Sequence, residues 1–593
     1  MKVSDYILEY IKKLGVEHVF CVTGGGAMHM NDSLGRCEGV EGVFMLHEQG
    51  AAIAAEAYAR ARDGYGVCLV TSGPGATNAL TGLAGAYMDS IPVLFISGQV
   101  KRADLRDKEG VRQFGIQEVD IISMATSYSK YAVQIKEPED ICYELEKAAA
   151  LAKSGRPGPV WIDVPLDIQA SEIELENVRH FDANLVKDFP VRQKDLDKVI
   201  EAFNNSKRPV ILLGHGIRLS NGISEARKLY ETLGVPVLTS WNGVDLIEED
   251  NPLYFGRPGA IGSRHANFIM QNADMVLTIG TRLNLLATGY NFESFLENAT
   301  HIMVDIDEAE MNKKSVHPDI KVVCDAKSFL NGMLERVNEI EKKDRSSWLK
   351  HCNELKEKYP LEIPEIAARE GYVSNYHLIE EISKQMNSDD NYQFTSSGTT
   401  IDIAMKTFKI KWGQRAFLTK GLAAMGYDIP ASIGNCIGSR RRVICVTGDG
   451  SACMNMQELE VIKRLNLPIK LFVADNSGYS MIYGSQNGNF KGRLTGCTKE
   501  SGLTLPNFER LAKAFGIKAM HIENEKKLAK QVKKALDFDG PVVCTTHADI
   551  LQKILPKQTN YMREDGQMAS RPLEDMSPLL ERDEFEKAMH YGE

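Results

Sequence analysis

Short runs of apolar residues alternate along most of the chain with segments in which apolar residues recur at helical spacing. Nine such runs stand out, and several of them lack polar alternation, as expected for strands that are buried on both faces of a parallel sheet. They are Val67–Thr71, Val93–Ser97, Val160–Val164, Val210–Gly214, Val276–Gly280, Ile302–Asp305, Val443–Thr447, Ile469–Ala474 and Val542–Thr546. The repeated order of strand, glycine-rich turn and helix predicts doubly wound α/β domains, with parallel sheets covered by helices on both faces.

Two polar, charged segments interrupt this pattern, at about residues 167–198 and 337–371. They predict three α/β domains, residues 1–170, 190–340 and 370–552, and a polar tail, residues 553–593, without a strand signal. A length of 593 residues agrees with three or four domains.

Charge, hydrophobicity and cysteine content argue against several kinds of binding partner. The net charge of −10 leaves no surplus of basic residues to neutralise nucleic-acid phosphates. No stretch approaches the roughly 18 apolar residues that cross a bilayer, and the N-terminal segment has the spacing of an amphipathic helix ending at Gly15 rather than of a signal peptide. The 11 cysteines include no CxxC pair, which favours buried, reduced thiols over a zinc site or a disulfide scaffold. We therefore expect a cytoplasmic protein that binds neither nucleic acid nor membranes.

Glycine-rich turns after strands are the usual phosphate-binding places in α/β domains. Four turns have this character: Thr23–Met28, Ser72–Asn78, Gly214–Leu219 and Gly448–Cys453. None completes the GxGxxG of dinucleotide-binding dehydrogenases, and the chain has neither the Gly-Lys pair of a P-loop nor the GxSxG of a nucleophile elbow. The sequence therefore does not support these three classes.

The segment 448–478 carries the most specific chemical signal. One buried strand runs into Asp449, and the next strand runs into Asn476. Because neighbouring parallel strands end at the same sheet edge, we expect these two side chains to lie close together. Carboxylate and amide oxygens suit Mg²⁺, and the flanking glycines let a diphosphate approach the backbone. A plain strand-turn-helix capped by Asp449 is the alternative interpretation.

This arrangement resembles the diphosphate-and-magnesium motif of thiamin diphosphate enzymes. The resemblance implies that Asp449, Asn476 and the carbonyl of Gly478 bind Mg²⁺. It also implies that the turn Gly448, Gly450 and Ser451 holds the cofactor's diphosphate.

Glu48 gives a second signal, since it precedes an alanine-rich helix in MLHEQGAAIAAEAYARARDGYG. Taken alone it reads as a helix-start carboxylate favoured by the helix dipole. In the thiamin diphosphate family, however, a Glu at this position activates the cofactor. A carboxyl group bonded to ring N1′ in a dry pocket favours the imino tautomer that removes the C2 proton.

The subfamily is readable from longer stretches: LVTSGPGATNALTGLAGAYMDSIPVLFISGQV, LHEQGAA, RPGPVWIDVPLDIQ and KGLAAMGYDIPASIG. They resemble acetolactate synthase, also called acetohydroxyacid synthase, and cover nearly the whole chain apart from the tail. The resemblance implies a pyrimidine-binding, a middle and a diphosphate-binding domain, and a homodimer or homotetramer with active sites between subunits. It further implies catalytic-site positions at Gly25 and Gln117, and cofactor contacts at Pro74, Asn78, Gly398, Thr399, Thr400, Met425 and Met481.

The chain departs from that family where the second substrate binds. Leu285 and Leu286 stand in place of an Asp-Arg pair, whose Arg recognises the carboxylate of the second 2-keto acid. Ser485 stands in place of a Trp that shapes the acceptor pocket, and Thr399 and Thr400 replace a Gln-His pair beside the diphosphate.

The middle domain leaves FAD binding open. Synthases of this branch carry FAD there, and Arg282, Gly214, Gly216 and Val304–Met311 agree with it. Ile261, however, falls where the family has a His, and the same residues can be turns of a domain without a nucleotide.

The resemblance implies a transferase or lyase that decarboxylates a 2-keto acid, most simply pyruvate, and ligates the acyl unit to a second carbonyl compound. Acetolactate formation is the default. Acyl transfer to a non-acidic acceptor such as a keto sugar or aldehyde stays open, as do simple decarboxylation and C–C hydrolysis. The opposing class is a non-catalytic nucleotide-binding scaffold. Loss of Glu48, Asp449 or Asn476 would favour that class, and all three are present.

Overall fold

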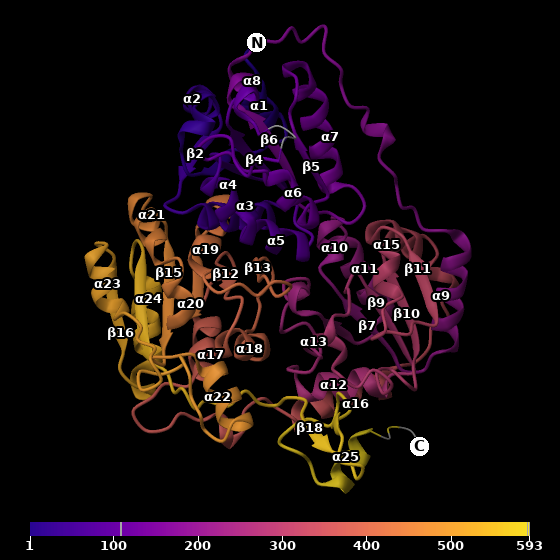
Figure 1. The fold of residues 1–593 in the computed structure, drawn as a ribbon. Coiled ribbons are helices and arrows are strands. Elements are labelled where there is room, and N and C mark those ends of the chain that lie inside the picture. The colour runs from indigo at the N-terminus through magenta and orange to yellow at the C-terminus, as the bar shows by residue number, and fades with distance from the viewer. Residues whose placement is uncertain (107–109, 590, 592–593) are drawn as a thin grey trace.

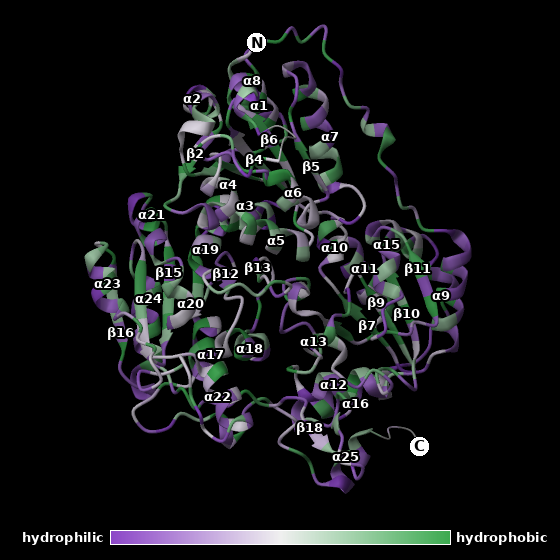
Figure 2. Cartoon of the chain, in the orientation of Figure 1, coloured by the Kyte–Doolittle hydropathy of each residue, from purple (hydrophilic) through white to green (hydrophobic). Residues whose placement is uncertain are grey.

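The structure is a computed structural model, and it describes residues 1–106, 110–589 and 591. Three parallel sheets form three lobes (Figure 1), which confirms the predicted doubly wound α/β class. All nine apolar runs are strands of these sheets. Apolar residues follow the strands and the helix faces that cover them, while polar residues line the outside (Figure 2). Within the described residues, no helix has both the length and the apolar character needed to cross a membrane.

The first sheet has six strands in the order β2-β1-β3-β4-β6-β5. Their bounds are β2 Glu41–Phe44, β1 His18–Cys21, β3 Gly66–Val70, β4 Val93–Gln99, β6 Val160–Pro165 and β5 Tyr131–Gln134. The main helices are α1 Val3–Lys13, α2 Met28–Arg36, α3 Glu48–Arg62, α5 Leu80–Met88 and α7 Ile141–Lys153. The predicted N-terminal helix is α1, and Gly15 follows it in the left-handed conformation at φ 79°.

The second sheet has five strands in the order β11-β10-β9-β7-β8. Their bounds are β11 Ile320–Val323, β10 Thr300–Asp305, β9 Met275–Ile279, β7 Pro209–Leu213 and β8 Val237–Thr239. Helices α9 Gln193–Asn205, α11 Ile223–Leu233, α12 Arg264–Asn272 and α15 Ala326–Glu335 accompany it. The polar segment 337–371 is not a plain linker, because it contains α16 Ser346–Lys358, whose buried Trp348, Cys352 and Leu355 join the middle-domain core.

The third sheet has six strands in the order β13-β12-β14-β15-β17-β16. Their bounds are β13 Ala416–Phe417, β12 Asn391–Phe394, β14 Val443–Gly448, β15 Ile469–Asp475, β17 Val542–His547 and β16 Lys518–Ile522. Its helices include α17 Asn375–Gln385, α18 Thr399–Thr407, α19 Asp428–Ser439, α20 Asp449–Cys453, α21 Leu459–Arg464, α22 Ser480–Asn489, α23 Phe508–Ala514 and α24 Leu528–Asp537.

The polar tail is more ordered than its sequence indicates. It forms an antiparallel hairpin, β18 Asn560–Met562 with β19 Met568–Ser570, and ends in α25 Arg582–Met589. The strand prediction failed there because three-residue strands with exposed or half-buried side chains leave no apolar run. The tail packs on the middle domain, where the fully buried Asn267 of α12 donates hydrogen bonds to the carbonyls of Gly259 and Leu573 (3.1 and 2.9 Å).

Helix α3 joins the first lobe to the third, because it packs along α19. The alanine-rich sequence of α3 keeps this contact close: a side chain at Gly434 would overlap the carbonyl of Ala54. Two hydrogen-bonded contacts reinforce the junction: Tyr427 of the third lobe donates to Glu56 of α3 (2.7 Å), and Arg415 donates to the carbonyl of Arg60 (2.9 and 3.1 Å). The first and third domains therefore hold a fixed mutual orientation within one chain.

Candidate active site

Glu48 is the first residue of α3, as its position before the alanine-rich helix indicates. The ring of His47 caps the helix by accepting a hydrogen bond from the N–H of Gln49 (3.1 Å). Asn78, the last residue of α4 (Pro74–Asn78), donates from its amide to Glu48 Oε2 (2.9 Å). The predicted positions Glu48, Pro74 and Asn78 thus lie together, with Pro74 and Asn78 exposed.

Gly25 and Gln117 lie at the same end of the first sheet. Gly25 begins a short 3-10 helix directly after β1, and the next residue, Gly26, donates a hydrogen bond to Thr71 at the end of β3 (3.0 Å). Gln117 has a φ of 65°, and a side chain on Gly73 would come within 3.0 Å of its Cα. Both positions therefore border the group around Glu48.

Asp449 and Asn476 follow the neighbouring parallel strands β14 and β15, as predicted. The Asp449 carboxylate is buried and accepts hydrogen bonds from the N–H groups of Gly450 (2.8 Å), Asn476 (3.1 Å) and Gly478 (3.3 Å). Burial and the neighbouring carboxylate of Asp475 raise the pKa of Asp449 to about 7. A site that holds a carboxylate out of water in this way favours a bound cation.

Asn476 supplies the clearest sign of a ligand site. Its Oδ1 is buried and has no hydrogen-bond partner in the described part of the chain. A buried amide oxygen without a partner is costly unless something else satisfies it. Together with Asp449 and the carbonyl of Gly478, it forms the all-oxygen donor set that Mg²⁺ prefers. These residues fit a magnesium ion.

The remaining cofactor positions lie around this loop. Gly398 is the N-cap of α18 with φ 88°, and Thr399 contacts Ser480 (3.1 Å between hydroxyls). The hydroxyl of Ser451 accepts a hydrogen bond from Gly426, next to Met425 (3.0 Å). A side chain at Gly450 would overlap the ring of Tyr479 and come within 3.3 Å of Met425. Thr400 is buried, whereas Met481 on α22 is 42% exposed.

Two residues near these groups were not identified from the sequence. Tyr479 covers Gly450, and Glu458 accepts hydrogen bonds from Leu46 and His47 beside Glu48. Glu458 stands in the MNMQELE stretch that follows the Gly448–Cys453 turn. Its partners Leu46 and His47, however, lie 412 and 411 residues away along the chain. Spacing along the chain carries no signal for such a contact.

The middle domain has a cavity of about 360 Å³ that adjoins residues of the other two lobes. Three of its lining residues carry buried polar atoms without a partner among the described residues: both ring nitrogens of His215, Asn242 Oδ1 and Thr281 Oγ1. Burial and the nearby arginines hold the pKa of His215 well below its usual range, so the ring is neutral. These unpaired atoms fit a polar ligand.

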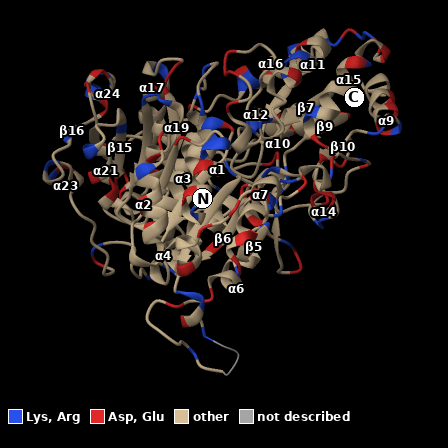
Figure 3. Ribbon diagram, turned by 90° about the horizontal axis from the view of Figure 1, so that it is seen from above, with Lys and Arg blue, Asp and Glu red and all other residues tan. Residues whose placement is uncertain are grey.

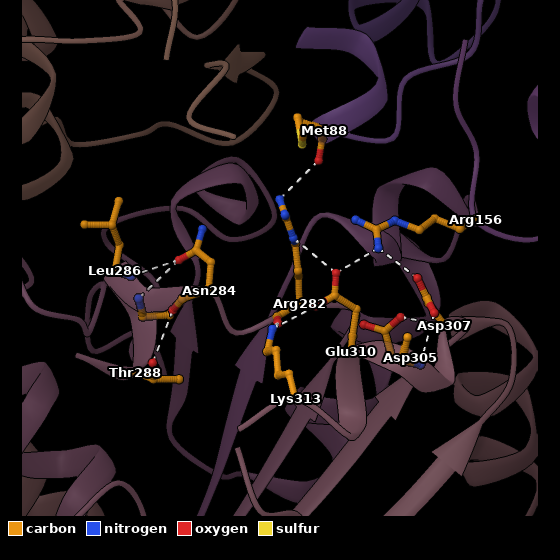
Figure 4. Close-up of polar contacts among 12 residues, drawn as sticks. Met88, Arg156, Arg282, Asn284, Leu286, Thr288, Asp305, Asp307, Glu310 and Lys313 are labelled. Carbon is orange, nitrogen blue, oxygen red and sulfur yellow. Dashed lines mark hydrogen bonds and ion pairs between the residues drawn. The ribbon is translucent and has the colours of Figure 1, made fainter. Parts of the chain in front are cut away.

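Arg282 lines this cavity, and its guanidinium lies between Glu310 and Met88 (Figure 4). It donates to Glu310 (3.2 Å) and to the carbonyl of Met88 in the first lobe (3.1 Å), at a φ of 59°. Arg156 of the first lobe meets the same Glu310 (2.8 Å) and Asp307 (2.9 Å). The cavity is therefore closed on this side by charge pairs between the lobes.

The two leucines that replace the Asp-Arg pair lie in α13 (Leu285–Thr288), which Asn284 caps through the N–H groups of Leu286 and Ala287 (Figure 4). Leu286 lines the cavity, and Leu285 is 43% exposed. Ser485 is exposed on α22, which has no buried residues. None of these three side chains carries a charge.

Three family models match the chain in sequence order: the N-terminal TPP binding domain of thiamine pyrophosphate enzymes at residues 1–124, their central domain at 196–333 and their C-terminal TPP binding domain at 397–546. These matches define the class, a thiamine pyrophosphate-dependent enzyme. The acetolactate synthase large subunit of Cyanidium caldarium is 32% identical over 576 residues, which covers 93% of this chain and 95% of that protein. A probable acetolactate synthase large subunit of Methanocaldococcus jannaschii is 32% identical over 558 residues, covering 91% of each chain. Acetolactate synthase 1 of Zea mays is 31% identical over 573 residues, covering 94% and 86%. The chain belongs to the acetolactate synthase family of thiamine pyrophosphate enzymes.

Proposed function

We propose that this enzyme decarboxylates a 2-keto acid, pyruvate in the simplest case, and ligates the acyl unit to a second carbonyl compound, as acetolactate synthases do. The observation that carries the proposal is the unpaired, buried Oδ1 of Asn476 beside Asp449. The family matches favour this reaction over a simple decarboxylase, a C–C hydrolase or a non-catalytic scaffold.

In the proposed site, Asp449, Asn476 and the Gly478 carbonyl hold Mg²⁺, and the turn around Gly448, Gly450 and Ser451 holds the diphosphate. Bound thiamin diphosphate supplies an electron sink for the decarboxylation. Glu48 would hydrogen-bond the aminopyrimidine ring and move its activating proton, with its carboxylate oriented by Asn78. Met425 and Tyr479 both lie against Gly450.

The test is release of CO₂ from pyruvate by the purified protein, with thiamin diphosphate and Mg²⁺ each added or omitted, together with mass analysis of the product. We expect CO₂ only with both additions, and acetolactate when pyruvate is the sole substrate. A protein that binds the cofactor but releases no CO₂ from any 2-keto acid would contradict the proposal.

The acceptor is the open half of the reaction, and Leu286 favours a second candidate. A guanidinium pairs with a carboxylate through two hydrogen bonds, whereas a leucine offers none. Lys130 and Arg282 are not free to bind the carboxylate in place of the missing guanidinium. Lys130 already donates to Ser154, and Arg282 already donates to Glu310. An uncharged acceptor such as an aldehyde or keto sugar therefore loses less on binding here than a second 2-keto acid does.

For the middle-domain cavity, we propose a nucleotide cofactor, FAD by family resemblance. The unpaired atoms of His215, Asn242 and Thr281 support a polar ligand there. Heat-released supernatant of the purified protein should show the absorbance of a flavin. A colourless supernatant at a protein concentration sufficient for detection would exclude FAD.

We also propose that two copies share each active site. Glu48 and Asp449 make no hydrogen bond to each other in the described residues, and several apolar side chains in the segments that carry the predicted site residues are exposed in one chain. They include Leu46, Phe114, Ile116, Met454, Met481 and Ile482, with Ile116 88% exposed. Exposed apolar side chains in such segments support an interface with a second copy.

A cytoplasmic location completes the proposal. All eleven cysteines are free thiols, which suits a reducing compartment. Basic and acidic residues are interspersed over the view in Figure 3, without a broad basic field among the residues drawn. This agrees with a small-molecule enzyme rather than a nucleic-acid binder.

A further inference from the structure

The segment that leads into Glu48 is attached to the diphosphate-binding domain of the same chain. Glu458, the last residue of a 3-10 helix (Met456–Glu458), is fully buried at 0% exposure. Its carboxylate accepts hydrogen bonds from the N–H of Leu46 (3.2 and 3.3 Å to its two oxygens) and from the N–H of His47 (3.0 Å). Arg464 adds a hydrogen bond to the carbonyl of Phe44.

The fit around this carboxylate is close. A side chain at Gly50, in the first turn of α3, would stand 2.5 Å from Glu458 Oε1. The carboxylate therefore lies directly against the helix start, where backbone N–H groups and the helix dipole favour negative charge. Burial raises the pKa of Glu458, and the hydrogen bonds from the two backbone N–H groups lower it. The pKa is about 7, because burial has the larger effect.

Among the described residues, a single hydrogen bond holds the side chain of Glu48. Asn78 is the hydrogen-bond partner of its carboxylate within the described residues, and Asn78 is exposed. The direction of the Glu48 carboxylate consequently depends on the backbone of residues 46–48. Glu458 fixes that backbone through both peptide N–H groups that precede Glu48.

We propose that Glu458 is a positioning residue for Glu48: it sets the place of the activating carboxylate without touching cofactor or substrate. The proposal rests on the proposed function, because it gives Glu48 its role in cofactor activation. A displacement of about 1 Å of a catalytic group can cost about 100-fold in rate. Glu458 therefore contributes to activation through geometry and leaves binding of the diphosphate to Asp449 and its neighbours.

The test measures exchange of the C2 proton of bound thiamin diphosphate for deuterium, in the absence of substrate, by acid quench and NMR. In Glu458→Gln one carboxylate oxygen becomes an NH₂ group; in the place of Oε2 it faces the N–H of Leu46, and this contact becomes repulsive. We expect exchange to slow about 10- to 100-fold, with Mg²⁺-dependent cofactor affinity within about threefold of wild type. Glu460→Gln is the matched control, because Glu460 lies two residues on and makes no hydrogen bond or ion pair in the described part of the chain.

A double-mutant cycle separates positioning from general structural damage. If Glu458 acts through Glu48, Glu458→Gln should slow exchange much less in a Glu48→Gln background than in the wild-type background. Glu458→Asp, which keeps the charge but withdraws the carboxylate, should give an intermediate rate and replaces the Gln variant if that variant does not fold.

Three results would overturn the proposal. The first is C2 exchange in Glu458→Gln within twofold of wild type. The others are equal slowing in the wild-type and Glu48→Gln backgrounds, and a cofactor affinity that falls in parallel with exchange. A wild-type protein that catalyses no C2 exchange at all would instead overturn the function proposed for the site. The two failures are thus distinguishable.

Discussion

Glu48 and Asp449 are each the first residue of a helix, one on α3 and the other on α20. At that position the backbone N–H groups and the helix dipole stabilise negative charge. The two residues differ in their surroundings. Asp449 is buried and accepts three backbone hydrogen bonds, whereas Glu48 is partly exposed. Burial suits a metal ligand, and an accessible carboxylate suits a group that must meet a cofactor ring.

Replacing Glu48 by Gln should separate cofactor binding from turnover. Gln keeps the shape and can still bond Asn78, but it cannot take up and release a proton. Turnover should fall by roughly 10²- to 10⁴-fold, while thiamin diphosphate affinity stays near the wild-type value. Steady-state kinetics and a binding titration check this, and unchanged turnover would remove Glu48 from the mechanism.

Replacing Asp449 by Ala should have the opposite signature. It removes the charged donor from the proposed magnesium site, so cofactor affinity at fixed Mg²⁺ should drop at least tenfold, by about 1.4 kcal/mol or more. Titration of thiamin diphosphate at several Mg²⁺ concentrations measures it. If the variant binds as tightly as the parent, another group holds the metal.

At the scale of elements, the sequence predicts what is buried on both faces. Strands β3, β4, β6, β14 and β15 are almost wholly buried, and each appears as an apolar run. The edge strands β2, β5 and β16 were not predicted from the sequence, because their partly exposed positions interrupt any apolar run. The proximity of Asp449 and Asn476 was predictable, since the neighbouring parallel strands β14 and β15 end at the same sheet edge. Glu458 and His215 were not, because their surroundings come from other domains.

The tail also depends on a contact between distant elements. Lys406 of α18 is fully enclosed and donates to the carbonyl of Pro556 at the start of the tail. Burial lowers the pKa of Lys406 to about 7. In the unfolded chain the group keeps its higher pKa, so between pH 7 and about 10 the unfolded state binds more protons than the folded state. This residue therefore makes the protein more stable as pH rises through that window.

Lys406→Met should remove that dependence. The difference in melting temperature between wild type and variant should shift in favour of wild type from pH 7 to pH 9, and should stay flat below pH 7. Lys409→Met is a suitable control on the same part of the chain, since Lys409 is an exposed residue paired with Glu380. Parallel melting curves for wild type and Lys406→Met over the whole range would contradict the assignment.

At the scale of the molecule, buried charges bind the three lobes together. Arg415 of the third lobe pairs with Asp245 of the middle lobe and donates two hydrogen bonds to the carbonyl of Arg60 in the first lobe (2.9 and 3.1 Å). Removing one partner of such a pair leaves a buried charge without compensation, which costs about 3–5 kcal/mol. The lobes therefore keep a fixed orientation within one chain.

That rigidity makes the sharing of sites between copies testable by mixing two inactive variants. In a hybrid dimer of Glu48→Gln with Asp449→Ala, shared sites give one site with both defects and one intact site. Statistical exchange of subunits should then restore about a quarter of wild-type activity, because half of the dimers are hybrids with one working site each. Mixing Glu48→Gln with Asn78→Ala is the control: both changes lie in the same domain, so every shared site of their hybrid keeps one defect and activity should not rise. If the Glu48→Gln and Asp449→Ala mixture also stays inactive after verified exchange, both groups act from one chain, and the exposed apolar surface near them has another purpose.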